Sequence, residues 1–342
     1  MSIPFCLRER VDLRTRNTFG VPAQARRLLE VDDVAALPEA LAALGPACPL
    51  VLGGGSNLLF VDDVDAVLAI ADARRAIVAD DGVAAHVRTA AGASWHDVVM
   101  WTLAQGLGGL ENLALIPGTV GAAPIQNIGA YGVEVADRIH AVEAFDRQRG
   151  APVSLDAAAC GFGYRDSVFK QTPDRWIVTA VTFALSRRAA PVLDYAGIRD
   201  ALAARGVAAP TPSHVAEAVI AIRRSKLPDP AVIGNAGSFF KNPIVDAATA
   251  AALRETHPDL PVFPVNDGRR KLSAAWLIDR CGWKGHRDGD AGVSAGHALV
   301  LVNHGRAHGR DLLALARRIA DSVQARFGVA LAPEPRIVGA AW

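Results

Sequence analysis

The chain has 342 residues, of which 51% are hydrophobic and 21% are charged, and this composition is typical of a globular protein with two or three domains. The 36 Lys and Arg residues nearly balance the 35 Asp and Glu residues, so no overall field favours nucleic acid or an anionic membrane. The four cysteines form no C-x-x-C pair, and no apolar run approaches the roughly 18 residues that span a bilayer. Because residues 1–10 also lack the order of a signal peptide, we expect a cytoplasmic protein without a metal site.

A run of three glycines, Gly53 to Gly55, follows a short apolar segment that predicts a buried strand. Consecutive glycines allow successive N–H groups to face one concave side and hold phosphate oxygens, and Ser56 and Asn57 add side-chain donors. The run is neither a Rossmann fingerprint, whose third glycine position holds Leu58 here, nor a Walker loop, because no Gly-Lys-Ser/Thr follows. Two interpretations stay open at this point, a phosphate-binding loop and a flexible tight turn.

Mixed strands and helices are predicted from residue 21 to residue 188. Alternating or β-branched residues predict strands at 67–70, 87–89 and 177–183. Ser94 begins a predicted helix that ends near Gly106. The stretch 106–132 is rich in glycine and almost uncharged, and a loop of that length is usually functional. We expect this stretch to be buried against a flat apolar surface.

A further cluster at residues 161–167 contains Tyr164 and Arg165. An arginine beside an aromatic ring can present its planar fork to a carboxylate. The ordinary alternative is a surface ion pair with Asp166 or Asp174.

A polar break with a proline lies at residues 187–191, and a second unit is predicted from residue 231 onward. Between them a helix is predicted at 213–224, which Pro228 and Pro230 prevent from continuing. The last predicted helix, 311–327, has its apolar residues on one face and ends at Gly328.

Ser238 lies in a dense cluster at residues 235–243, where Asn235 or Lys241 could hold its hydroxyl. The absence of a G-x-S-x-G pattern argues against an acyl-enzyme nucleophile, whereas a buried hydroxyl can donate a proton. The alternative is a turn hydroxyl that binds its own backbone. Glu334 stands in an extended, proline-flanked segment and indicates little by itself. His304 and His308 have the spacing of a metal pair, but glycines interrupt the helix that such a pair needs.

These clusters occur together in one order that resembles the UDP-N-acetylenolpyruvoylglucosamine reductases over essentially the whole chain. The motifs that carry the resemblance lie at residues 17–20, 52–60, 109–118, 124–132, 162–167, 226–230, 235–243 and 277–279. The resemblance implies an α+β fold, with a two-lobed FAD-binding domain of the PCMH/vanillyl-alcohol-oxidase type and a smaller α/β substrate-binding domain. The expected boundaries are 21–188 for the FAD domain, with residues 1–20 and the strand near 329–342 packing on it, 189–230 for a connecting segment and 231–328 for the substrate domain.

The family reduces UDP-N-acetylenolpyruvoylglucosamine to UDP-N-acetylmuramate for peptidoglycan synthesis, with a hydride from NADPH that passes through FAD. The resemblance assigns catalysis to three residues. Arg165 and Glu334 would lie at the substrate carboxylate, and Ser238 would donate the proton to C2. Non-covalent FAD would contact Gly53, Gly54, Gly55, Ser56, Asn57, Leu58, Asn127 and Gly129. The substrate would contact Tyr164, Tyr195, Lys226, Asn242 and Arg336, with Tyr195 on a loop typical of the longer members of the family.

The expected partners are therefore the UDP-sugar and NADPH, and we expect a monomer that binds neither nucleic acid nor membrane. Two rival functions remain, an oxidase with covalently attached FAD and a nucleotide-sugar sensor that has lost its chemistry. The glycine loop contains no His or Cys for covalent attachment, although Cys48 lies just upstream. Pro335 departs from the family pattern and removes a backbone donor, which puts the hydrogen bonding of this segment in question.

Overall fold

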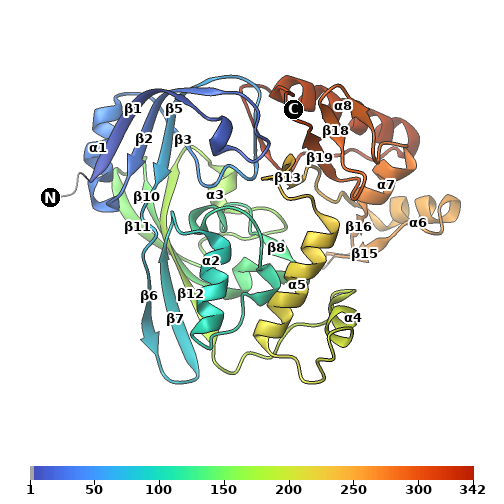
Figure 1. Ribbon diagram of the computed structural model, residues 1–342, viewed down its shortest axis with the longest axis horizontal. Coiled ribbons are helices and arrows are strands. Elements are labelled where there is room, and N and C mark those ends of the chain that lie inside the picture. The colour runs from blue at the N-terminus through green and yellow to red at the C-terminus, as the bar shows by residue number, and fades with distance from the viewer. Residues whose placement is uncertain (1–3, 266) are drawn as a thin grey trace. The chain divides into compact units, whose positions relative to one another are not determined.

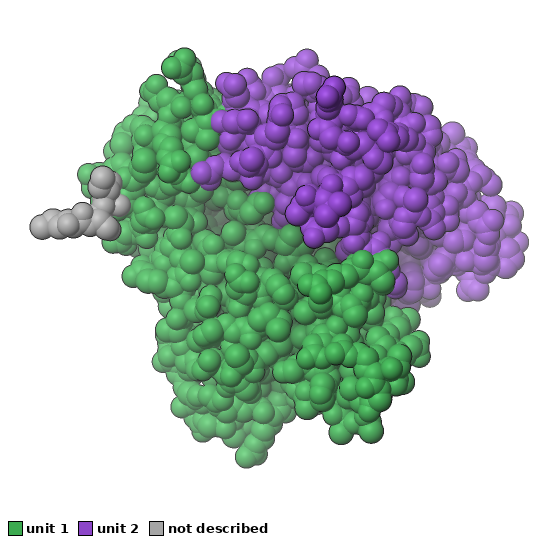
Figure 2. Space-filling model, viewed as in Figure 1, with its two compact units in different colours: residues 1–11, 25–54, 64–225 green, residues 12–24, 55–63, 226–342 purple. Residues whose placement is uncertain are grey.

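The computed structural model describes residues 4–265 and 267–342 and separates the chain into two compact units (Figures 1 and 2). Unit 1 consists of residues up to 11, 25–54 and 64–225, and unit 2 consists of residues 12–24, 55–63 and 226–342. Within the described ranges we find no helix with both the length and the apolar character needed to cross a membrane. The assignment of an FAD domain to 21–188 and of a substrate domain to 231–328 stays a prediction.

The first sheet of unit 1 has the strand order β1-β2-β5-β3, and β5 pairs in parallel with both of its neighbours. Its elements are β1 (Phe5–Asp12), β2 (Gln24–Val31), β3 (Leu50–Val51), β5 (Val64–Ile70) and the neighbouring helix α1 (Leu37–Leu44). Buried leucines of α1 pack on buried residues of β2 and β5. Phe145 and Ile177, from the second sheet, join the same cluster, so the two sheets share this core.

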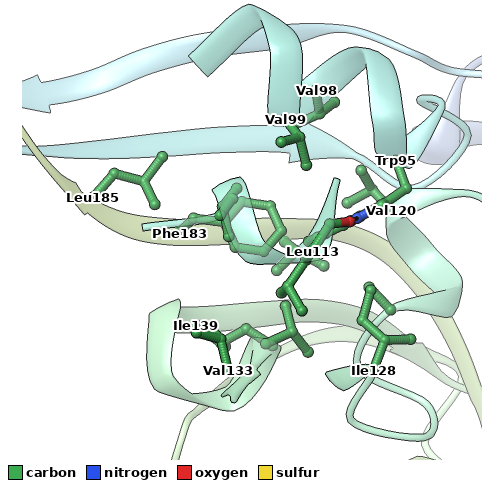
Figure 3. Packing of buried hydrophobic residues seen from close by; sticks show 14 of the residues in the cluster. Trp95, Val98, Val99, Leu113, Val120, Ile128, Val133, Ile139, Phe183 and Leu185 are labelled. Carbon is green, nitrogen blue, oxygen red and sulfur yellow. Dashed lines mark hydrogen bonds between the residues drawn. The ribbon is translucent and has the colours of Figure 1, made fainter. Parts of the chain in front are cut away.

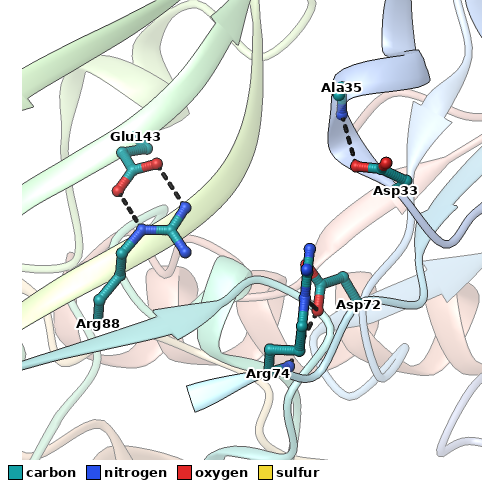
Figure 4. Close-up of polar contacts among 6 residues, drawn as sticks. All are labelled: Asp33, Ala35, Asp72, Arg74, Arg88 and Glu143. Atoms are coloured by element: carbon teal, nitrogen blue, oxygen red, sulfur yellow. Dashed lines mark hydrogen bonds and ion pairs between the residues drawn. The ribbon is translucent and has the colours of Figure 1, made fainter. Parts of the chain in front are cut away.

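The second sheet is antiparallel with the order β11-β10-β12-β7-β6. Its strands are β6 (Arg75–Asp80), β7 (Ala84–Ala90), β10 (Ile139–Asp146), β11 (Ala151–Asp156) and β12 (Trp176–Ser186). The predicted strands at 67–70, 87–89 and 177–183 are confirmed within β5, β7 and β12. On β7 and β10, Arg88 and Glu143 form a bidentate pair with N···O distances of 2.6 and 2.7 Å (Figure 4).

The remaining helices and short strands of unit 1 are α2 (Trp95–Ala104), α3 (Val168–Gln171), α4 (Ile198–Ala203), α5 (Pro212–Lys226), β8 (Gly129–Ala130) and β9 (Val133–Glu134), with α5 ending at the first residue of unit 2. The predicted helix that begins after Ser94 is confirmed as α2, because the Ser94 hydroxyl accepts a hydrogen bond from the N–H of Asp97. The helix predicted at 213–224 is confirmed as α5.

The uncharged stretch 106–132 contains only short regular pieces, the 3-10 helices η3 (Glu111–Leu113) and η4 (Val120–Ala122) and the strand β8. Its apolar side chains enter the main core of unit 1, where Leu113, Val120 and Ile128 pack among residues of α2 and β12 (Figure 3). The Trp95 indole N–H donates to the Leu113 carbonyl at 2.8 Å. The near absence of charge in this stretch is explained at least in part by burial in the core of the protein itself.

Unit 2 contains the antiparallel sheet β13-β19-β18-β17 and the three-stranded sheet β14-β16-β15. The strands are β13 (Gly234–Ser238), β14 (Ile244–Val245), β15 (Val262–Pro264), β16 (Arg270–Leu272), β17 (Arg287–Asp288), β18 (Ala291–Val293) and β19 (Val300–Asn303), and the helices are α6 (Ala247–Thr256), α7 (Ala274–Arg280) and α8 (Gly309–Phe327). The predicted last helix is confirmed as α8, and Gly328 ends it with a φ of 67°.

The C-terminal segment of unit 2 pairs with a strand almost three hundred residues earlier. The strand β20 (Arg336–Val338) lies parallel to β4 (Leu58–Phe60), with Arg336 opposite Leu58. On its other side the segment before β20 contacts the residues that follow β13, where the N–H of Lys241 donates to the carbonyl of Ala332 at 3.0 Å. Residues 332–338 therefore lie between two well-separated parts of the sequence.

Candidate functional site

The glycine loop begins on unit 1, directly after β3. Gly53 and Gly54 are exposed, and the structure leaves no room for a side chain on their inner side. A Cβ at Gly53 would lie 2.5 Å from the Thr119 hydroxyl oxygen, and a Cβ at Gly54 would lie 2.9 Å from the Cα of Gly118. Close approach of the Thr119 side chain at Gly53 and of the Gly118 backbone at Gly54 is thus the reason for glycine at these positions.

The division into units falls between Gly54 and Gly55, so the loop continues on unit 2. Gly55 has a φ of 61°, and a Cβ there would lie 2.0 Å from the Arg16 carbonyl oxygen. Of the three glycines, this one alone has the left-handed conformation that side chains disfavour. Asn57 follows, and its side-chain amide donates to the Glu334 carbonyl at 3.3 Å. Ser56 and Leu58 complete the loop and are partly buried.

Arg165 is held in unit 1 by the backbone of a neighbouring turn. Its guanidinium donates to the Gly129 carbonyl at 2.6 Å and to the Asn127 carbonyl at 3.4 Å. A Cβ at Gly129 would lie 3.0 Å from the Arg165 Nη1 atom, so glycine allows this approach. The central guanidinium carbon of Arg165 also lies over the Tyr164 ring, 5.5 Å from the ring centroid. The backbone of Arg165 is itself strained, with a φ of 54°.

Asn127 supports this arrangement with its side chain. It is 1% exposed, and its amide donates to Glu134 at 2.7 Å and to the Gly163 carbonyl at 3.1 Å. Its side-chain oxygen accepts the N–H of Ala136 at 3.0 Å. Since both the nitrogen and the oxygen of the side-chain amide already bind the protein, the predicted contact of Asn127 with FAD would have to use the backbone.

Tyr195 packs against a second tyrosine that the sequence reading did not single out. The rings of Tyr131 and Tyr195 meet edge to face, with centroids 5.0 Å apart. Arg223, on α5, lies close to Tyr131, and burial lowers the pKa of its guanidinium although Tyr131 partly offsets the shift. Among the described residues, the Arg223 Nε atom is buried without a hydrogen-bond partner. A partly buried cation without an acidic partner is suited to an anionic ligand.

Ser238 is the last residue of β13 and pairs with Val300 of β19. The turn before it is fixed by Asn235, whose side-chain oxygen accepts the N–H of Gly237 at 3.0 Å and whose amide donates to Pro228 and Ile233 carbonyls. Asn235 therefore holds the backbone of the turn. In the ranges 4–265 and 267–342 we find no hydrogen bond from the Ser238 hydroxyl to the protein, which speaks against the turn-hydroxyl alternative.

Glu334 lies next to the end of β13. Its N–H donates to the Phe239 carbonyl at 2.8 Å, and the N–H of Arg336 donates to the Asn57 carbonyl at 3.0 Å. Backbone bonds thus persist on both sides of Pro335, which answers the question raised by that residue. The backbone segments that contain Ser238, Glu334 and Asn57 therefore lie next to one another within unit 2.

The other predicted substrate residues of unit 2 have separate surroundings. Asn242 accepts the N–H of Ala274, at the start of α7, at 3.0 Å. Lys226 lies near His297, where burial and then the charge of Lys226 lower the pKa of the imidazole. An open hollow of unit 2 is lined by residues 19–20, 230–234 and 303–305, and none of the predicted site residues lines it.

Sequence reasoning missed Arg223 and Tyr131, because the sequence shows little of what distinguishes these two residues. Tyr131 stands within the 124–132 motif, but nothing in the sequence indicates its contact with Tyr195. Arg223 is one of 31 arginines, counted as 36 basic residues less the five lysines, and only its burial distinguishes it.

The comparisons with known proteins decide the family. Residues 26–156 match the model of an FAD binding domain, and residues 229–338 match the model of the UDP-N-acetylenolpyruvoylglucosamine reductase C-terminal domain. A UDP-N-acetylenolpyruvoylglucosamine reductase from Xanthomonas axonopodis pv. citri is 57% identical over 340 residues, covering 98% of this chain and 97% of its own. The chain belongs to this reductase family.

Further relatives agree. The reductase from Xanthomonas campestris pv. campestris is 56% identical over 338 residues, which cover 98% of this chain and 97% of the relative. The crystal structure of the reductase from Thermus caldophilus superposes with a TM-score of 0.66 at 30% identity, covering 97% of this chain and 100% of that chain. The predicted fold class is confirmed: an α+β protein with a two-lobed FAD-binding domain of the PCMH type, followed by the C-terminal domain of the family.

Proposed function

We propose that this chain reduces UDP-N-acetylenolpyruvoylglucosamine to UDP-N-acetylmuramate, with NADPH as the hydride donor and non-covalently bound FAD as the carrier. The observation that carries the proposal is the arrangement of Ser238 and Glu334 on neighbouring, hydrogen-bonded backbone segments. A proton donor and a carboxyl group in that relation suit an acid-assisted addition across a double bond. The high identity to named reductases supports the same reaction. The proposed setting is peptidoglycan precursor synthesis in the cytoplasm.

The glycine loop fits the pyrophosphate of FAD. Its first two glycines expose their backbone, and residues 53–58 contain no charged side chain that would repel or compete with phosphate. Ser56 and Asn57 bring side-chain donors to the same loop, and backbone of the 127–129 segment completes the proposed contacts. When bound, FAD supplies a hydride to C3 of the enolpyruvyl group. Cys48 lies outside the glycine loop and its sulfur accepts a hydrogen bond from Arg147 at 2.9 Å, and covalent attachment there is not part of the proposal.

Arg165 would bind the substrate carboxylate. Addition of a hydride at C3 leaves negative charge that spreads from C2 into that carboxylate, so a preoriented guanidinium lowers the barrier. The Gly129 and Asn127 carbonyls fix the direction of the guanidinium before substrate binds. Glu334, protonated or sharing a proton, would assist at the same carboxylate.

Ser238 would deliver the proton to C2. The hydroxyl lies at the end of a strand whose turn is already fixed by Asn235, so the hydroxyl needs no loop movement to be oriented. With its hydrogen bonds not used within the described protein, the hydroxyl is available to the substrate and to a proton source.

The UDP group would be bound by cationic residues and by uncharged polar residues. Tyr195 and Lys226 suit the diphosphate, and Asn242 and Arg336 suit the sugar and nucleotide, with Tyr164 at the enolpyruvyl end. Arg223 beside Tyr131 adds a guanidinium that has no acidic partner among the described residues. A phosphate group bound by the planar guanidinium would be an anionic partner for Arg223.

The test is product formation by the purified flavoprotein. NADPH and the UDP-enolpyruvyl sugar are supplied together, and the product is analysed by mass spectrometry. We expect NADPH oxidation that requires the sugar, and a product heavier by two hydrogen atoms. NADPH oxidation that consumes oxygen and leaves the sugar unchanged would contradict the proposal and favour the oxidase. Acid precipitation checks the flavin linkage, since non-covalent FAD stays in the supernatant.

A further inference from the structure

Asn112 joins two segments of unit 1 that are far apart in the sequence. It lies in η3 and is 1% exposed. Its side-chain amide donates to the carbonyl of Tyr131 at 2.9 Å and to the carbonyl of Val192 at 3.0 Å. One buried amide group therefore ties the turn at residue 131 to the segment that leads to Tyr195.

The tied segments are in contact through their side chains as well. The Tyr131 and Tyr195 rings meet edge to face. A Cβ at Gly132 would lie 3.8 Å from a methyl of Val192 and 4.0 Å from the Cβ of Tyr195. The turn at 131–132 consequently forms the surface on which the Tyr195 segment rests. Tyr131 has a φ of 50°, so this turn is strained and needs support.

The Tyr195 segment is fixed on both sides of the tyrosine. On the N-terminal side, Val192 is bound by Asn112. On the C-terminal side, Ile198 begins α4 and is fully buried in the main core. Tyr195 itself is 46% exposed and lies in an irregular stretch between these two anchors. A short, doubly anchored segment has few conformations to lose when a ligand orders it.

We propose that Asn112 is a positioning residue for nucleotide binding, which acts by holding Val192 and the Tyr131 turn so that Tyr195 is preoriented toward a UDP-sugar diphosphate. This inference rests on the proposed function, in which Tyr195 contacts the diphosphate. Asn112 itself touches no ligand in this proposal.

A purely structural role must be separated from positioning. Two partly buried carbonyls lose their donor when Asn112 is replaced, and the free energy of unfolding falls whether or not a ligand is involved. A double-mutant cycle with Tyr195 makes the separation, because only a residue that acts through Tyr195 loses its effect when that side chain is absent.

The cycle compares the wild type, Asn112→Leu, Tyr195→Ala and the double variant, each as FAD-loaded protein. The dissociation constant of the UDP-enolpyruvyl sugar is measured by flavin fluorescence. We expect Asn112→Leu to weaken binding roughly tenfold in the wild-type background, as for two lost hydrogen bonds, and less than about twofold in the Tyr195→Ala background. Equal loss in both backgrounds, or no loss in either, would overturn the proposal. If Asn112→Leu does not fold, Asn112→Ala replaces it, since its smaller side chain leaves space for a water at the carbonyls.

Leu113→Ala is the matched control, because Leu113 is fully buried on the same 3-10 helix and is not part of the tether. We expect it to lower the melting temperature while the dissociation constant stays unchanged. Hydrogen exchange of the Ile198 and Ala201 amides, which donate to the carbonyls of Tyr195 and Gly197, supplies a readout without ligand and should accelerate in Asn112→Leu but not in Leu113→Ala. A wild type that fails to bind the UDP-sugar would overturn the proposed function, whereas unchanged exchange in Asn112→Leu would overturn the tether itself.

Discussion

The two units hold their candidate catalytic side chains by different means. In unit 1, Arg165 stands on a left-handed backbone and is fixed by hydrogen bonds from its side chain to the carbonyls of Asn127 and Gly129. In unit 2, Ser238 ends β13 and Glu334 lies in a bend before β20, and backbone N–H to carbonyl bonds hold both segments, together with the side chains of Asn235 and Asn57. Side-chain anchoring depends on the identity of each residue, whereas backbone anchoring tolerates changes of side chain. We therefore expect the site in unit 1 to be more sensitive to substitutions around it than the site in unit 2, where Asn235 and Asn57 are the exceptions because their side chains hold the backbone.

The strain in unit 1 is concentrated near its candidate residues. The non-glycine residues Leu115, Asn127, Tyr131 and Arg165 all have φ values between 45° and 59°. Each such conformation costs on the order of 1–3 kcal/mol and persists only where surrounding contacts enforce it. Asn127 supplies such contacts through three hydrogen bonds of its own side chain. In unit 2 the corresponding strain is borne by Gly237, where glycine removes most of the cost.

Ser238→Ala should have the largest effect and test the prediction for unit 2. Loss of a positioned proton donor should reduce turnover by roughly 10²–10⁴-fold, or about 3–5 kcal/mol of transition-state stabilisation. Flavin reduction by NADPH should stay nearly unchanged, because that step needs no proton at C2. Stopped-flow absorbance follows the two half-reactions separately, with Ser294→Ala as a control on unit 2. Equal slowing of both half-reactions would remove the proton-donor role from Ser238.

Gly54→Val should have the next largest effect and break the backbone approach in unit 1. The new side chain would meet the Cα of Gly118 at 2.9 Å, which forces the loop out of position. Overpacking of this kind costs typically 1–3 kcal/mol, so we expect FAD affinity to fall about tenfold or more. The flavin-to-protein absorbance ratio after gel filtration measures the loss. Gly82→Val controls for a loss of stability alone, since the positive φ of Gly82 strains a valine there although open space surrounds it. A flavin-rich Gly54→Val protein would contradict the assignment of the loop.

Lowering the pH should destabilise both units by one shared device. Burial lowers the pKa of His96 in unit 1 and of His297 in unit 2, and each imidazole Nδ1 accepts a backbone N–H, from Leu115 and Leu299. The folded state thus favours the neutral ring. The stability from this preference is complete above the ordinary pKa of 6.5 and is lost as the pH falls toward the lower folded values.

The double variant His96→Asn/His297→Asn tests this device, because an amide oxygen accepts the same bond without titrating. Between pH 7.5 and pH 5.5 we expect the melting temperature of the wild type to fall by roughly 2–4 °C more than that of the variant. Parallel falls in the two proteins would show that other groups govern the pH dependence.

Pro335→Val should have the smallest effect and sharpens the claim for backbone anchoring in unit 2. The N–H groups of Glu334 and Arg336 already have their partners, so an added donor at position 335 supplies no missing bond. We expect a change in unfolding free energy within about 0.5 kcal/mol and an unchanged kcat. Denaturant titration and steady-state turnover measure these two quantities. A large loss of turnover would show that the proline itself holds Glu334 in place.

The sequence predicted the elements that local physics determines. Ser94 capped α2 as expected, and Gly328 ended α8, because capping and periodicity act within a few residues. The pairing of β20 with β4 is different, since no local signal links Arg336 to Leu58. Only the resemblance to the reductase family predicts a catalytic role for Glu334, and that role stays a prediction.

Other features of the site could not be predicted because they depend on tertiary contacts. Asn112 looks like any polar residue of a loop, and its role as a link appears only when Tyr131 and Val192 are seen on either side of it. The prediction that the three glycines form one phosphate nest stays untested, but their neighbours give further reasons for glycine, which are close packing at Gly53 and Gly54 and backbone conformation together with close packing at Gly55. The sequence pattern draws attention to the glycines, but only the contacts in the folded chain explain why glycine is needed at each position.

The visible spectrum of the purified protein tests the central claim most directly. We predict a yellow protein with a flavin band that NADPH bleaches in the absence of oxygen. Addition of one equivalent of UDP-N-acetylenolpyruvoylglucosamine should then restore the band and yield UDP-N-acetylmuramate. A reduced flavin that the UDP-enolpyruvyl sugar leaves bleached, while oxygen restores its colour, would contradict the claim that this chain is the reductase.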